Sequence, residues 1–179
     1  DRYDDRDDVR TNLIESYDRL MAFIAKHLSD PFYLEGQVRI SLRDKIFREA
    51  VVNSLIHREY ANAFVAKMVI ENGRVVFENA SIANGFGPID PNSFVPHPKN
   101  PTIAKLFREM GLADELGSGV RNLYRYSKVY SHKDPELIEG DVFRVYVAIP
   151  EQATPQATPQ ATPQATGEDE RTKKIMDYC

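Results

Sequence analysis

The sequence predicts an α+β fold, a two-layer sandwich in which helices pack on one face of a mixed or antiparallel sheet. The clearest sign is Asn72-Gly73, the strongest short hairpin signal, which lies between the alternating residues 63–71 and 74–79. Amphipathic stretches with helical spacing precede and follow this hairpin. Residues 142–149 alternate apolar and polar side chains again, so we expect them to be the closing strand of the sheet.

The first helix is expected at residues 9–28, after a charged lead-in at residues 1–8. The apolar residues that recur there at helical spacing are Leu13, Ile14, Tyr17, Leu20, Met21, Ile24 and Leu28. Asp30 and Pro31 end the helix, because proline cannot continue the helical hydrogen bonds. The short and mixed residues 32–40 are expected to form a strand or an edge segment.

A second helix is expected after the cap residue Ser41, with Asp44 in the capping-box position. Glu49, Asn53 and His57 follow one another four residues apart and therefore share one face of this helix. A carboxylate can accept a proton from water, and an amide oxygen is a hard ligand suited to Mg²⁺. The face is therefore a candidate catalytic support. The alternative is an ordinary exposed polar stripe on an amphipathic helix.

Glycines gather in a long loop after the hairpin. Asn84, Gly85 and Gly87 fall within residues 80–99, which also hold four prolines, at positions 88, 91, 96 and 98. A loop of this length inside a compact domain is usually functional or mobile. The alternative for Asn84-Gly85 is a plain turn.

A second glycine cluster opens the last helix. Before it, a helix is expected from the cap Asn100, with Pro101 at its first position and Gly111 after its end. Gly117 and Gly119 then begin the next helix. Backbone N–H groups at a helix N-terminus bind phosphate, and glycines let phosphate approach closely. The alternative is again a plain turn.

The last helix also combines tyrosines with basic side chains. These residues are Arg121, Tyr124, Arg125, Tyr126, Lys128 and Tyr130. One interpretation is a surface that contacts DNA directly. The other, which is the ordinary arrangement of an amphipathic helix, is that the tyrosines belong to the core and the charges face water.

The domain organisation follows from composition. Residues 1–150 are expected to form the folded domain. Residues 151–166 are dominated by an ATPQ repeat without large apolar side chains, and we expect an extended linker. Residues 167–179 carry Ile175 and Met176 on a charged background, which we expect to be the first turns of a helix in a further domain.

Composition also limits the partners and the compartment. The chain has 179 residues, a formal net charge of −4 and one cysteine, Cys179. The negative charge argues against attraction of the whole surface to nucleic acid or to an acidic membrane. With no internal disulfide, no signal-peptide pattern and no membrane-spanning apolar run, we expect a cytoplasmic protein without a membrane partner. The two ends indicate a piece of a longer protein.

Three segments in this order, REAVVNSLIHREY, KNPTIAKLFREMG and ELGSGVRNL, resemble a known family. A helix with E-x-x-x-N, a hairpin, a loop with glycines and a G-x-G that opens a helix is similar to the GHKL ATPase fold of gyrase, histidine kinases and MutL proteins. The closer resemblance, over residues 2–150, is to a divergent branch found in bacterial transcriptional regulators called RecG-like and helicase-related. Those regulators carry an N-terminal AlbA-type (Schlafen-like) domain and a C-terminal winged helix, which residues 167–179 would begin.

This resemblance implies roles for the residues of the second helix and the hairpin. Glu49 would be the catalytic base that orients water on the γ-phosphate of ATP, and Asn53 would bind the Mg²⁺ that the triphosphate holds. Asn79 stands near the position of the aspartate that reads the adenine amino group. The D-x-G-x-G box of that aspartate is absent, and Gly85 and Gly87 supply the glycines later in the chain.

The resemblance also implies roles for the later segments. Gly117 and Gly119 would match the second glycine box, beside the phosphates of the nucleotide. Residues 88–100 would be a short version of the nucleotide lid, and a short lid would close poorly, which argues against rapid turnover.

The implied function is an ATP-binding regulatory module of a multidomain bacterial transcriptional regulator, with weak or no hydrolysis. DNA would be bound through flanking domains, and a homo-oligomer is compatible with this role. The sequence has no helicase motor motif, so we do not expect unwinding. The alternative is a degenerate scaffold or dimerisation domain that binds no nucleotide and links DNA-binding domains.

Overall fold

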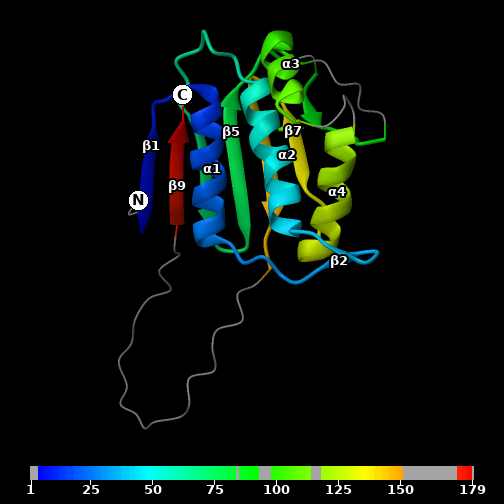
Figure 1. Ribbon diagram of the computed structural model, residues 1–179. Helices are drawn as coiled ribbons and strands as arrows, with labels where there is room; N and C mark the ends of the chain where they lie inside the picture. The colour runs from blue at the N-terminus through cyan, green and yellow to red at the C-terminus, as the bar shows by residue number, and fades with distance from the viewer. Residues whose placement is uncertain (1–3, 84, 93–97, 114–117, 151–172, 179) are drawn as a thin grey trace.

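The computed structural model describes residues 4–83, 85–92, 98–113, 118–150 and 173–178. These residues form the expected two-layer α+β sandwich. A seven-stranded sheet has the strand order β1-β9-β4-β5-β8-β7-β6, and its pairs are antiparallel except for β1 with β9. The labelled helices lie on one face of this sheet (Figure 1).

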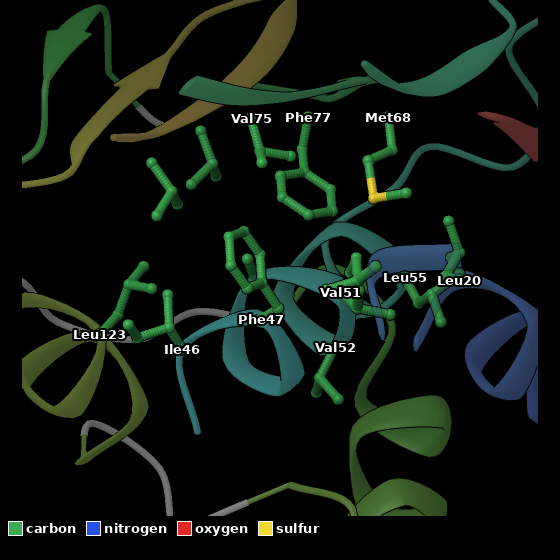
Figure 2. Packing of buried hydrophobic residues seen from close by; sticks show 14 of the residues in the cluster. Leu20, Ile46, Phe47, Val51, Val52, Leu55, Met68, Val75, Phe77 and Leu123 are labelled. Carbon is green, nitrogen blue, oxygen red and sulfur yellow. The ribbon is translucent and has the colours of Figure 1, made fainter. Parts of the chain in front are cut away.

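Three helices lie side by side on the sheet: α1 (Leu13–His27), α2 (Leu42–Ile56) and α4 (Ser118–Ser131). Figure 1 shows α2 between α1 and α4, with the shorter α3 (Pro101–Glu109) at one end of the molecule. Because neighbours cover α2 on several sides, ten of its fifteen residues are buried. Phe47 of α2 points toward Phe77 of the sheet, with ring centroids 6.5 Å apart (Figure 2).

The central hairpin consists of β4 (Ala66–Glu71) and β5 (Arg74–Ala80) and forms as predicted. Gly73 has φ of +81°, a left-handed conformation that glycine adopts at little cost. β8 (Val142–Ala148) pairs with β5, which confirms the expected strand, although β8 does not close the sheet. β7 (Glu136–Glu139) and the two-residue β6 (Gly87–Pro88) extend the sheet beyond β8.

Local cap and turn signals are confirmed at the start of α2. Asp44 donates its backbone N–H to the Ser41 side chain at 3.0 Å, which is one of the two hydrogen bonds of a capping box. The preceding residues form a hairpin of two-residue strands, β2 (Leu34–Glu35) and β3 (Val38–Arg39). The expected strand or edge segment is therefore this small hairpin.

The expected start of the first helix is wrong. Residues 5–9 form strand β1 (Asp5–Val9), and α1 begins only after Asn12, whose side chain accepts the backbone N–H of Glu15 at 3.0 Å. The charged lead-in can be a strand because it lies at the edge of the sheet and because α1 supplies cations to it: Lys26 Nζ is 2.8 Å from Asp5 Oδ2.

The expected helix near the end of the chain is also wrong. Lys173–Tyr178 form strand β9, which lies between β1 and β4. Both neighbours pair with its backbone, β4 antiparallel and β1 parallel, and Met176 is completely buried. The sheet thus satisfies the backbone of a segment whose own sequence pattern favoured a helix. Residues 151–172 lie outside the described residues, so the linker stays a prediction, as does the start of a further domain after it.

Within the described part of the chain, no helix has the length and apolar character needed to cross a membrane.

Candidate functional site

The polar face of α2 is covered rather than exposed to solvent. Glu49 is 4% exposed, and Asn53 and His57 are partly buried. Glu49 and Asn53 lie within the helix and His57 is its C-cap residue, so the four-residue spacing keeps all three on one side. The interpretation of this face as an ordinary exposed stripe is therefore wrong.

Glu49 lies directly against the first turn of α4. A Cβ atom added to Gly119 would stand 2.2 Å from Glu49 Oε2 and 3.1 Å from its Cδ, closer than side chains pack. Glycine at this position therefore allows α4 to approach the carboxylate. The positive end of the α4 dipole favours a carboxylate at this place. Arg48 Nη2 lies 3.6 Å from Glu49 Oε1 and adds a second positive charge.

Two buried amide atoms have no hydrogen-bond partner among the described residues. They are Nδ2 of Asn53 and Oδ1 of Asn79. Asn79 is completely buried, and its Nδ2 donates to the Ala80 carbonyl at 3.1 Å. A buried polar group without a partner costs about 1–3 kcal/mol, so a ligand that supplies the missing partner gains affinity at these atoms.

Asn79 lies on the helix-facing side of the sheet, near the C-terminal end of α2. Phe77, two residues earlier on β5, faces α2, and side chains two apart on a strand share a face. Asn79 pairs in register with Phe143 of β8, whose ring centroid is 6.3 Å from that of His57. These contacts connect Asn79 through Phe143 to the polar face of α2.

His57 is uncharged at neutral pH. Burial and, to a smaller extent, the positive charge of Lys99 together lower the pKa of its imidazole to about 4, whereas Glu139 acts in the opposite direction. The neutral ring offers one N–H donor and one nitrogen acceptor.

Lys99 and Glu139 belong to the same region. Lys99 lies in the segment 88–100 that was expected to be the nucleotide lid, whereas Glu139 had no predicted role. Lys99 Nζ lies 3.9 Å from Glu139 Oε1, and the two side chains are 17% and 21% exposed. Asn100 positions Lys99, because its Nδ2 donates to the carbonyls of Ile56 at 2.9 Å and Arg58 at 2.7 Å, at the end of α2. The sequence did mark Asn100, through Pro101 after it, but this pattern was interpreted as the cap of α3. The Asn100 side chain makes no such cap bond.

The loop glycines lie beside Glu139. A Cβ atom on Gly85 would be 4.0 Å from Glu139 Oε2, and Gly87 of β6 pairs in register with Glu139. Gly87 has φ of +114°, which favours glycine. Asn84 and Gly117 were also predicted to take part and lie outside the described residues. Of the predicted glycines, Gly119 lies against the Glu49 carboxylate, whereas Gly85 and Gly87 lie beside Glu139.

The tyrosines of α4 belong to the core, as the second interpretation proposed. Tyr126 and Tyr130 are 6% and 4% exposed. The Tyr130 hydroxyl donates to the Ser29 carbonyl at 2.8 Å. Arg125 pairs with Glu35 of the small hairpin at 2.6 Å, so its guanidinium forms an intramolecular ion pair.

The described residues contain no cluster of three or more His, Cys, Asp or Glu side chains that could hold a metal ion. A divalent cation at Asn53 would therefore need further oxygen ligands from a bound molecule, since one amide oxygen is a small part of an octahedral shell.

Comparison with known proteins adds a family match. Residues 64–147 match the family model described as "Putative ATP-dependent DNA helicase recG C-terminal". The match covers just under half of the chain and supports a RecG-related, ATPase-like domain. It includes Asn79, Lys99 and Gly119 but begins after α2, which carries Glu49 and Asn53. None of the curated proteins compared with the sequence matches it.

The fold has a counterpart among solved structures. The crystal structure of the DIP2311 protein from Corynebacterium diphtheriae, a structural genomics target, superposes with a TM-score of 0.56 at 18% sequence identity. The alignment covers 82% of this chain and 34% of that protein, so the chain spans about a third of that protein's length. At this identity the likeness concerns the fold.

Proposed function

We propose that this chain is a nucleotide-binding module of the GHKL kind that takes ATP together with Mg²⁺ and hydrolyses it slowly or not at all. The match to a RecG-related, ATPase-like family supports a nucleotide ligand. The two-layer fold, with a polar helix face above the sheet, provides a compatible framework. The observation that carries the proposal is the pair of unpartnered amide atoms.

The two amide atoms require opposite partners. Asn53 Nδ2 is a donor and needs an acceptor, whereas Asn79 Oδ1 is an acceptor and needs a donor. Adenine nucleotides supply both, because phosphate oxygens accept hydrogen bonds and the amino group of adenine donates them. The chemistry of the two amides therefore suits a ligand with a phosphate end and an amino-bearing base.

Asn53 can also serve a magnesium ion. Rotation of its side-chain amide exchanges Oδ1 with Nδ2 in nearly the same volume, so an oxygen can face the ligand instead. Mg²⁺ binds typically through one or two protein oxygens together with substrate phosphates. The bound ion would neutralise phosphate charge, and Asn53 would be its protein ligand.

The position of Glu49 supports the proposal that hydrolysis is slow or absent. As the base implied by the resemblance, it would have to contact a water molecule beside the γ-phosphate. Its carboxylate instead lies against Gly119 and is 4% exposed. A general base must come within hydrogen-bond reach of its water, so turnover would require α4 to move away.

The role that we propose for the module is regulatory. Nucleotide binding would change how flanking DNA-binding domains, or two copies of the protein, are arranged in a bacterial transcriptional regulator. The composition supports this indirect role, because a net charge of −4 does not favour DNA contact by the module itself.

Calorimetric titration of the 179-residue chain with ATP and ADP, with and without Mg²⁺, tests the proposal. We expect saturable, magnesium-dependent binding that Asn53→Ala weakens and that Asn62→Ala leaves unchanged, since Asn62 is an exposed turn residue. Unchanged affinity in Asn53→Ala would mean that the assigned site is wrong.

The burial of Glu49 also favours a second candidate function, a scaffold or dimerisation domain without nucleotide. In that case ATP and ADP would give no heat of binding. The chain would form dimers whose population, measured by sedimentation, depends on protein concentration and not on nucleotide.

A further inference from the structure

Lys99 combines burial with an incomplete set of partners among the described residues. Its side chain is 17% exposed, and its ammonium forms an ion pair with Glu139 at 3.9 Å. An N–H···O hydrogen bond needs a separation of about 2.7–3.2 Å, so this pair is attractive without being hydrogen-bonded. Lys67 and Glu78, on the other face of the sheet, show a direct pair at 2.8 Å. Lys99 therefore retains N–H donors that Glu139 does not use.

The neighbouring residue Asn100 holds the chain at Lys99 in place independently of this ion pair. The two hydrogen bonds from the Asn100 side chain attach the chain at Lys99 to the C-terminal end of α2. Lys99 lies close enough to His57 for its charge to disfavour the imidazolium. His57 follows Asn53 by one helical turn on the same face.

A cation thus lies near His57, which follows the unpartnered donor of Asn53 by one helical turn. Asn53 Nδ2 and the Lys99 ammonium both need acceptors, and neither can accept a hydrogen bond. A phosphate group supplies several acceptor oxygens and a negative charge. It also offsets the cost of keeping an ammonium mostly away from water, which a carboxylate at 3.9 Å does only in part.

We propose that Lys99 binds a phosphate group of the nucleotide and that this phosphate replaces Glu139 as the close partner of the ammonium. The inference rests on the proposed function and extends it to a residue outside the polar face of α2. It assigns the anionic part of the ligand to the region between the end of α2 and the end of β7.

The competing explanation is that Lys99 is a structural residue that connects the start of α3 to β7 through Glu139. The two explanations differ in what the ligand must carry. A structural lysine would affect all ligands of the site alike, whereas a phosphate-binding lysine would affect only ligands with phosphate.

The experiment compares ATP, ADP and adenosine binding to the full chain and to Lys99→Met by calorimetry. A charge-assisted hydrogen bond is worth about 1.5–3 kcal/mol, so the affinity for ATP and ADP should fall by about 10- to 100-fold. The affinity for adenosine should change by less than about twofold. The salt dependence of ATP binding should also become weaker, because one screened charge contact is lost.

Two further variants make the result specific. Lys105→Met removes an exposed lysine of α3, 3.7 Å from Glu109, and should leave all three affinities unchanged. Lys99→Arg keeps the positive charge and should retain most of the ATP affinity. If circular dichroism shows that Lys99→Met is misfolded, Lys99→Arg still tests whether a positive charge at this position is sufficient.

The outcomes separate the inference from the proposed function. If Lys99→Met weakens ATP and adenosine equally, or weakens neither while Asn53→Ala abolishes ATP binding, the lysine does not bind phosphate and the nucleotide site stands. If the unmodified chain binds neither ATP nor adenosine, the proposed function fails, and this inference fails with it.

Discussion

The carboxylate of Glu49 on α2 and the backbone of Gly119 on α4 are in direct contact, with no space between them for a side chain. The residue expected to activate water is therefore covered by the helix whose first turn was expected to bind phosphate. This contact joins α2 to α4, and it accounts for a glycine at a position inside a helix, where glycine is otherwise unfavourable.

Substitution Gly119→Ala should destabilise the fold. The new Cβ atom would lie 2.2 Å from Glu49 Oε2, and overpacking of this kind typically costs about 1–3 kcal/mol. Urea denaturation of the variant measures the loss. Gly140→Ala is the matched control, because a Cβ atom there meets nothing closer than 3.7 Å and should change the stability little.

A double-mutant cycle identifies Glu49 as the cause. If the clash is with this carboxylate, the Glu49→Ala/Gly119→Ala variant should lose less stability than the sum of the two single variants, because the truncated side chain makes room. Additive losses would contradict the contact.

Asn79→Ala should remove the preference for adenine. Asn79 Oδ1 is an unpartnered acceptor and suits the 6-amino group of adenine, whereas inosine carries an oxygen there. The unmodified chain should bind ATP more tightly than inosine triphosphate, by about 2- to 10-fold for one neutral hydrogen bond. Asn79→Ala should bind both equally. A preference that survives the substitution would exclude Asn79 from base recognition.

His57 should make the fold less stable as the pH falls. Its pKa is about 4 in the folded chain and 6.5 in the reference state, so the unfolded chain binds the proton more readily between these values. The neutral imidazole therefore contributes fully above pH 6.5, and about 3 kcal/mol is lost as the pH falls to about 4. Among the described residues, Lys99 and Glu139 are the charged groups that act on His57, and the Phe143 ring lies beside it.

Denaturation of His57→Gln at several pH values tests this contribution. The variant should lose less stability than the unmodified chain between pH 6.5 and 4, although other groups titrate in both proteins. Lys99→Met should raise the pKa of His57, measured by NMR of the imidazole protons, because it removes a nearby positive charge. Identical pH profiles for His57→Gln and the unmodified chain would show that His57 is not buried in neutral form.

Met176→Ala tests whether the end of the chain belongs to the sheet. Met176 is fully buried in β9, and truncation of a buried methionine costs about 2–5 kcal/mol. Met110, which is 42% exposed, is the control, and Met110→Ala should change stability by less than about 0.5 kcal/mol. An equally small effect at Met176 would contradict the placement of β9 and favour a helix of a further domain.

The sequence predicted those parts of the fold that depend on local signals. The Ser41 cap and the Asn72-Gly73 hairpin need only neighbouring residues, and both form as expected. Strands β1 and β9 could not be predicted in this way, because each depends on pairing with a distant segment. Residues 5–9 have no apolar alternation of their own, so only the partner strand makes them a strand.

The candidate site was predictable to a similar extent. Helical spacing placed Glu49 and Asn53 on one face of α2, but it gave no indication that α4 covers Glu49. Asn100 looked like a helix cap because of Pro101, and its bonds to the end of α2 join residues 42 and 44 positions apart. The position of Lys99 follows from those bonds and could not be read from the local pattern.

The proposed function requires that the chain binds ATP through the polar face of α2. The most direct test is calorimetric titration of the 179-residue chain with ATP in the presence of Mg²⁺, beside the same titration of Asn53→Ala. We expect saturable binding in the micromolar range that Asn53→Ala weakens while remaining folded. Equal affinities for the two proteins, or no binding by the unmodified chain, would contradict it.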